Sequence, residues 1–264
     1  MRANIPVRTL GGFVAATAFA GASAADWMQF GYDATHSGRN TAETTLSAAN
    51  VDQVQRRYQA TLPKDVDSAP VYLSGVQTSG GTRDLLFLLA QDGTLMAVDA
   101  ADGSVVWQHQ APGQNITTSA PAIDPGRQYV YAYGLDGYVH KYRVDNGAET
   151  TSGGWPELVT LKTDVEKVAG SLTIATSGAT TYLYVVTDGY AGDFGNYQGH
   201  LTTINLANGH QDVFNSQCSD EIIHFDDSND CAWPMPGDSG GSGIWGRGGA
   251  TFDAGTNRVY VATG

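Results

Sequence analysis

The stretch Ala97-Val98-Asp99-Ala100-Ala101-Asp102-Gly103-Ser104-Val105-Val106-Trp107 decides the fold of this chain. It joins a short apolar run to a second, β-branched run through the dipeptide Asp102-Gly103. Asp-Gly supplies the positive φ angles of a tight hairpin turn, and β-branched and aromatic residues suit a pleated, half-buried surface. The stretch therefore predicts two antiparallel strands joined by a tight turn.

The same arrangement recurs along the chain at a fixed spacing. Ser68-Ala69-Pro70 returns as Ser119-Ala120-Pro121, 51 residues later, and Gly170-Ser171-Leu172 lies another 51 residues on. Each marker precedes a β-rich run, an Asp-Gly dipeptide, a second run and a further turn that contains glycine. The dipeptides are Asp92-Gly93, Asp136-Gly137 and Asp188-Gly189, and the further turns carry Gly103, Gly147 and Gly209.

A repeat of this length predicts a β-propeller. Each unit is a small antiparallel meander, which cannot bury its apolar face alone, so we expect the units to pack face to face as blades. We expect an all-β fold with units at about 61–113, 114–164 and 165–243, and the start of a fourth unit at 244–264. The only segment with helical character is 46–57, where Ser47 is placed to cap a short turn of helix.

The first unit resembles a known family. Residues 97–107 are similar to the A-x-D-x-x-x-G-x-x-x-W repeat of pyrroloquinoline-quinone-like (PQQ-like) propellers, in which the tryptophan, here Trp107, docks between neighbouring blades. The N-terminal segment, 25–60, resembles the segment that leads into the first blade of these proteins. The second and third units depart from the repeat, with NGAETTSGGW and NGHQDVF in its place. Since rings of this family have seven or eight blades, the resemblance implies an incomplete propeller, the N-terminal part of a longer protein.

The first 24 residues predict a secretory signal peptide. Arg2 and Arg8 precede an apolar run that ends at Ala22-Ser23-Ala24, which is an A-x-A cleavage site after Ala24. We expect a secreted or periplasmic protein without a lipid anchor, because no cysteine follows the cleavage site. No later stretch approaches the roughly 20 apolar residues of a membrane helix.

The charge of the chain excludes one class of partner. Its formal net charge is −13, and loss of Arg2 and Arg8 with the signal peptide makes it −15. Such a surface repels phosphate backbones, so nucleic acid is not an expected partner.

The two cysteines predict a disulfide. Cys218 and Cys231 would lie in an oxidising compartment after export, and their pairing would close a loop of about 13 residues. A zinc site is disfavoured because the intervening sequence, which contains His224, lacks close ligand pairs.

One short string suggests a different function. Gly237-Asp238-Ser239-Gly240-Gly241 matches the letters around the nucleophile of trypsin-like serine proteases. That chemistry needs a histidine base and an orienting acid on a fold of two barrels. None of the six histidines has the sequence setting of that base, and Ser242 stands where those enzymes carry proline. We reject the protease and interpret the string as a glycine-rich crossing between blades.

The family resemblance leaves two functions open. The first is a quinoprotein dehydrogenase that oxidises alcohols or sugars with PQQ and Ca²⁺. The resemblance implies Asp193, in Gly192-Asp193-Phe194-Gly195, as metal ligand and Trp245 as the aromatic support of the cofactor. The plainer interpretations are a turn carboxylate for Asp193 and a blade-packing residue for Trp245. Aligned without a gap, Arg247 takes the place of Trp245, and Gln198 stands where the family has arginine.

The second function is a binding or scaffold propeller without cofactor, as in assembly proteins of the BamB type. A rigid propeller offers a broad face of loops to a protein, peptide or glycan ligand. Aromatic residues in the long loops would suit such a face: Tyr190, Phe194, Tyr197 and Phe225. We favour this second function, because two of the three repeats have lost the motif and several expected cofactor residues are replaced.

Overall fold

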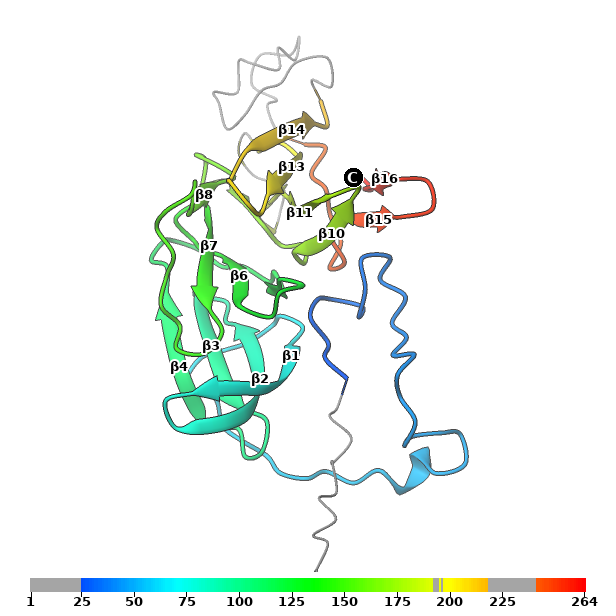
Figure 1. Cartoon of the computed structure of the whole chain (residues 1–264). Helices are drawn as coiled ribbons and strands as arrows, with labels where there is room; N and C mark the ends of the chain where they lie inside the picture. The colour runs from blue at the N-terminus through cyan, green and yellow to red at the C-terminus, as the bar shows by residue number, and fades with distance from the viewer. Residues whose placement is uncertain (1–24, 192–194, 196, 218–240) are drawn as a thin grey trace, which may run out of the picture.

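The computed structural model describes residues 25–191, 195, 197–217 and 241–264. Strands make up nearly all of the regular structure, and they form three four-stranded antiparallel sheets followed by a two-stranded sheet (Figure 1). Each four-stranded sheet contains strands in chain order, apart from the short strand β12. The expected incomplete propeller of three blades and the start of a fourth is therefore confirmed.

The first blade contains the stretch that decides the fold. Its strands are β1 (Val71–Thr78), β2 (Gly81–Leu89), β3 (Thr94–Asp99) and β4 (Val105–Gln110). The β3–β4 turn has Gly103 at φ +80°, and the Gly103 amide donates to the Asp99 carbonyl at 2.7 Å. Across the hairpin, Ala97 pairs with Trp107.

The later blades repeat this meander with different strand lengths. The second blade has β5 (Ala122–Ile123), β6 (Tyr129–Tyr133), β7 (Tyr138–Arg143) and β8 (Glu157–Leu158). The third has β10 (Thr173–Ser177), β11 (Thr180–Val186), β13 (His200–Asn205) and β14 (Gln211–Asn215). The fourth begins with β15 (Thr251–Asp253) and β16 (Arg258–Tyr260). Two short strands, β9 (Glu166–Lys167) and β12 (Asp188–Gly189), pair as a separate ribbon.

Two local expectations need correction. The short turn of helix expected within 46–57 is present as the 3-10 turn η1 (Val51–Gln53), but its N-cap is Asn50 rather than Ser47 and has no side-chain cap. Asp188-Gly189, expected to be a hairpin turn like Asp92-Gly93, lies in β12, and both residues are buried. This dipeptide pairs with β9 instead of closing a hairpin between two strands of the blade.

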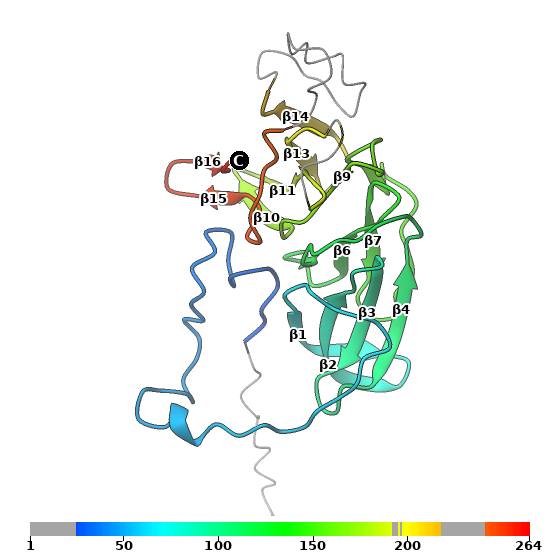
Figure 2. The same ribbon diagram turned by 180° about the vertical axis from the view of Figure 1, so that it is seen from behind.

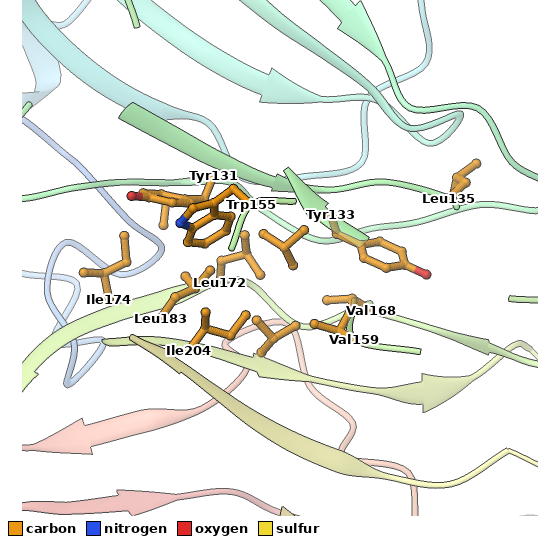
Figure 3. Packing of buried hydrophobic residues seen from close by; sticks show 13 residues of the cluster. Tyr131, Tyr133, Leu135, Trp155, Val159, Val168, Leu172, Ile174, Leu183 and Ile204 are labelled. Atoms are coloured by element: carbon orange, nitrogen blue, oxygen red, sulfur yellow. The ribbon is translucent and has the colours of Figure 1, made fainter. Parts of the chain in front are cut away.

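Most of the apolar core lies between the blades, and a smaller cluster lies between the first blade and the segment that precedes it. Because each blade is only one sheet thick, its faces become buried against its neighbours. One cluster joins the second and third blades (Figure 3), with buried members such as Tyr131, Trp155, Leu172, Leu183 and Ile204. Equivalent clusters join the first blade to the second and the third blade to the fourth.

Hydrogen bonds between the second and third units follow the period of the sequence. The hydroxyl of Thr117 donates to the Val168 carbonyl at 2.6 Å, and that of Ser119 donates to the Gly170 carbonyl at 2.8 Å. Each bond joins residues 51 positions apart. The repeat marker that contains Ser119 is therefore hydrogen-bonded to the marker of the next blade, which contains Gly170.

The N-terminal segment crosses the innermost strands of the blades. Its backbone or side chains bond residues of all four described blades: Trp27 with Tyr72, Met28 with Ile123, Gln29 with Ile174 and Ala34 with Phe252. Both ribbon views show this blue segment beside the open side of the blades before the chain turns away toward η1 (Figures 1 and 2). The segment thus ties together strands that lie far apart in the sequence.

Among the described residues, no helix has the length and apolar character required to cross a membrane. The signal peptide predicted at 1–24, the pair Cys218 and Cys231, and the string around Ser239 lie outside the described residues.

Candidate functional site

The long connections of the blades emerge on one face, here called the loop face. In an antiparallel meander, alternate connections lie at opposite ends of the sheet. One end carries the connections 111–121 and 159–172 and the described parts of the next two connections, 187–191, 197–199, 216–217 and 241–250, while the opposite end carries mostly tight turns, the exception being 144–156. A rigid frame with loops gathered at one end is the usual setting of a binding site.

The β9–β12 ribbon gathers buried charges beneath the loop face. Asp188 pairs with Lys167 across the ribbon, and Gly189 pairs with Glu166. Gly189 is required there, because a Cβ at this position would lie 2.7 Å from the Tyr197 ring. The ribbon therefore holds two acids and one base that solvent does not reach.

Glu166 is the most fully bonded of these groups. Its carboxylate accepts hydrogen bonds from the Thr160 hydroxyl at 2.6 Å and from the Gln198 amide at 2.7 Å, and Lys162 lies 3.4 Å away. Burial raises the pKa of Glu166, while Lys162 and these hydrogen bonds act in the opposite direction. Glu166 thus fixes the loops of the second and third blades to one another.

Asp188 is buried with fewer partners. Burial raises its pKa to about 7, although Lys167 and the nearby Ala169 amide lower it and Glu166 adds to the rise. No group among the described residues donates a hydrogen bond of normal geometry to either carboxylate oxygen of Asp188. The Lys167 ammonium itself lies 5.3 Å from the centre of the Tyr190 ring. Asp188 is therefore an acid that changes charge near neutral pH.

His200 remains neutral in this cluster. Burial, with a smaller contribution from Lys162, lowers its pKa to about 4. Its Nδ1 lies 3.1 Å from the Thr187 hydroxyl and 3.8 Å from Glu166. A neutral imidazole beside Glu166 completes a polar core rather than an ion pair.

The structure gives the contacts of two residues implied by the family resemblance. The Trp107 indole donates to the Val144 carbonyl at 3.1 Å, from the first blade to the second. Trp245 is half-buried and meets Tyr197 edge to face, with ring centres 5.9 Å apart. The backbones of Gly243 and Gly264 also lie against its indole ring. Asp193 lies outside the described residues, and the roles of all three residues stay predictions.

Arg247 binds the segment that leads into the first blade. Its guanidinium donates to the Asp67 carboxylate at 2.9 Å and to the Asp67 carbonyl. This pair joins residues 180 positions apart, from the start of the fourth blade to the segment before the first. The guanidinium of Arg247 is therefore engaged in an ion pair with Asp67.

The expected aromatic binding face is corrected in two places. Tyr197 is 4% exposed because it packs against Trp245, and Tyr190 is half-buried, with its hydroxyl donating to the Thr163 carbonyl at 3.1 Å. Neither ring stands free on the loop face. Phe194 and Phe225 lie outside the described residues.

Sequence reasoning missed Glu166, Lys167 and Asp188. The available signal was weak: charged residues next to apolar ones around 165–168, and an Asp-Gly dipeptide that looked like an ordinary turn. Their burial depends on the pairing of β9 with β12, which no local pattern encodes.

Comparison with known proteins places this fold. A family model of PQQ-like repeats, described as outer membrane protein assembly factor BamB, matches residues 34–216. The chain belongs to this family. No protein of curated function matches it.

Solved structures similar to this PQQ-like propeller include large oxidoreductases. A europium-containing methanol dehydrogenase has a TM-score of 0.63 at 16% identity, covering 90% of this chain and 42% of its own. Quinohemoprotein alcohol dehydrogenases from Pseudomonas putida and Comamonas testosteroni have TM-scores of 0.61 and 0.60 at 16% and 17% identity. Each is matched over 90% of this chain, but the chain spans only 34% and 35% of their lengths. At this identity the likeness establishes the shared PQQ-like propeller fold.

Proposed function

We propose that the chain is part of an exported, non-catalytic PQQ-like propeller that binds a protein partner on its loop face. The observation that carries the proposal is a pair of exposed aliphatic side chains on two neighbouring loops. Ile116, between the first and second blades, is 43% exposed, and Leu161, between the second and third, is 61% exposed. Exposed aliphatic side chains on neighbouring loops offer apolar surface that a bound partner can cover.

The loops that carry these residues are fixed to one another. The Thr163 carbonyl accepts hydrogen bonds from the Asn115 amide at 3.4 Å and from the Tyr190 hydroxyl at 3.1 Å. Three connections therefore meet at one carbonyl group. A preorganised surface loses less conformational freedom when a partner binds, which favours affinity.

The family description suggests the partner. Because the matching model is described as an outer membrane protein assembly factor, we propose an unfolded outer-membrane protein as the ligand. Such a chain exposes apolar side chains that can contact Ile116 and Leu161.

The test is a binding titration with a labelled, unfolded outer-membrane β-barrel protein, diluted from urea and followed by fluorescence anisotropy. We expect saturable binding to the purified protein, weakened about tenfold in the double variant Ile116→Ser/Leu161→Ser. The matched control is Val105→Ser/Phe214→Ser, which removes apolar side chains of similar exposure from the outer strands β4 and β14. Equal affinity of the two double variants would exclude the loop face.

The second candidate is a quinoprotein dehydrogenase, and the specific observation in its favour is Asp188, an acid with a pKa near neutrality that is buried beneath the loop face. The described residues do not fit PQQ, which is a polycarboxylate and needs free cationic groups. Lys162 is paired with Glu166, Arg247 with Asp67, and Lys167 lies beside Asp188. Nor do the described residues gather three acidic or histidine side chains around one possible metal position.

A direct assay separates the two candidates. The purified protein is incubated with PQQ and Ca²⁺, and dye reduction is followed with alcohols and sugars. We expect no dye reduction and no change in melting temperature. Substrate-dependent reduction would favour the dehydrogenase.

A further inference from the structure

A cavity of about 420 Å³ lies between the second and third blades, on the face opposite the loop face. It is lined by the β5–β6, β10–β11 and β13–β14 connections and by strand residues of the second blade. Its apolar wall includes Pro125, Ala179, Leu206 and Ala207. A cavity of this size suits a small molecule.

The cationic group of the cavity is Lys141. Its ammonium lies 4.3 Å from the centre of the Tyr129 ring, 5.4 Å from that of Trp155 and 5.8 Å from that of Tyr131. No described residue forms an ion pair or hydrogen bond with this ammonium, and the side chain is half-buried. Burial lowers the pKa of Lys141, and Asp124 acts in the opposite direction. Its three N–H donors therefore face the cavity without an acceptor from the described protein.

Two further donors lie beside Lys141 without acceptors. The Trp155 indole N–H is buried and has no hydrogen-bond partner among the described residues. The Tyr131 side chain lines the cavity, and no described residue bonds its hydroxyl, which is not among the fully buried groups. The two rings pack with centres 4.8 Å apart, and Figure 3 shows their polar atoms at the same end of the apolar cluster. A buried donor such as the Trp155 N–H is unfavourable without an acceptor, and the Tyr131 hydroxyl is open to an acceptor in the cavity.

The acidic side chain that lines the cavity, Asp124, is hydrogen-bonded to backbone amides of its own turn. Asp124 accepts hydrogen bonds from the backbone amides of Gly126, Gln128 and Tyr129, at 3.0, 2.8 and 2.6 Å. These amide dipoles offset its charge, and Asp124 forms no ion pair with Lys141. The cationic and donor groups therefore determine which ligand fits.

We propose that this cavity binds a small organic acid, whose carboxylate pairs with the Lys141 ammonium and whose apolar body lies against Leu206 and Ala207. Charge-assisted hydrogen bonds in a half-buried site are stronger than neutral ones, so the carboxylate gives both affinity and orientation. The site is independent of the loop face, because it lies at the other end of the blades.

The test uses 4-phenylbutyrate as the probe and isothermal titration as the measurement. We expect saturable binding to the purified protein, at least about tenfold weaker binding of the neutral amide of the same acid, and the same loss in Lys141→Gln. The matched control is Lys64→Gln, which removes a half-buried lysine that pairs with Asp92 and does not line this cavity. The control should keep the affinity of the unaltered protein.

A second readout guards against a folding defect in the variant. In the unaltered protein, the indole N–H signal of Trp155 should shift on titration in ¹H–¹⁵N spectra, and Trp155→Phe assigns that signal. Equal binding of acid and amide, unchanged affinity in Lys141→Gln with an unshifted Trp155 signal, or no saturable binding at millimolar probe would each overturn the proposal.

Discussion

At the scale of the residue, the same Asp-Gly letters have two different roles in this chain. Asp92 and Asp136 accept hydrogen bonds from the Thr94 and Tyr138 amides, as aspartate does in a tight turn. Asp188 is followed by a glycine that belongs to a strand, and it lies buried beside Lys167. The sequence predicted all three as turns, because it shows the dipeptide but not the partner strand.

The burial of Asp188 predicts a pH dependence of stability. Its folded pKa of about 7 exceeds the ordinary value of 3.8, so between these pH values the folded protein retains a proton that the unfolded chain has lost. Asp188 therefore makes the free energy of unfolding fall as the pH rises through this window. In Asp188→Asn this fall, measured by urea denaturation between about pH 5 and about pH 8, should shrink by about 2 to 3 kcal/mol.

The control for this prediction is Asp102→Asn, at an exposed carboxyl whose pKa is lowered by hydrogen bonds to Ser104. Because this lowered pKa lies below the ordinary value of 3.8, Asp102→Asn should leave the fall in the free energy of unfolding between about pH 5 and about pH 8 as it is in the unaltered protein. A slope in Asp188→Asn equal to that of the unaltered protein would mean that Asp188 is not a buried acid.

At the scale of the element, the β3–β4 hairpin of residues 97–107 meets the turn of the next blade. Trp107 of this hairpin lies against Gly147, which has φ +71°. At the next junction Glu157 lies against Gly209 in the same way, while Trp155 lies in the core cluster. The sequence predicted the hairpins and their turns. It did not show that Glu157, rather than Trp155, would contact Gly209, because the second unit departs from the repeat before Trp155.

Glycine substitution tests this contact. Gly147→Ala adds a methyl group about 2.7 Å from the Trp107 ring, whereas Gly153→Ala adds one in open space at a similar φ of +67°. Both variants should lose about 1 kcal/mol from the positive φ angle, and Gly147→Ala should lose about 1 to 3 kcal/mol more from the collision. Urea midpoints measure the difference, and equal midpoints would contradict docking of Trp107 on this turn.

At the scale of the whole molecule, three of the four apolar clusters formed by the described residues belong to two blades each, while the fourth packs the first blade against Leu62 and Val66 of the preceding segment. Stability should therefore be distributed as in a stack, with each interface supporting the two blades that it joins. The 51-residue period predicted this stacking. It did not predict the crossing N-terminal segment, since hydrogen bonds to the edges of strands leave no periodic signal in the sequence.

Core truncation tests the stack. Leu183→Ala, between the second and third blades, should cost about 2 to 5 kcal/mol. Amide hydrogen exchange should then increase more in β5–β8 and β10–β14 than in β1–β4.

The matched variant is Leu85→Ala, at an equally buried site between the first and second blades. It should shift the increase toward β1–β8. A uniform increase in both variants would mean that the blades unfold as one unit.

The N-terminal segment also sets an order of events during synthesis. Gln29 bonds Ile174, 145 positions away, and His36 lies 3.3 Å from the hydroxyl of Thr251, 215 positions away. Gln29 and His36 therefore leave the ribosome long before their partners Ile174 and Thr251 are synthesised. Contacts between residues so far apart in the sequence form slowly. We therefore expect the N-terminal segment to reach its native position only after the blades that it contacts have formed.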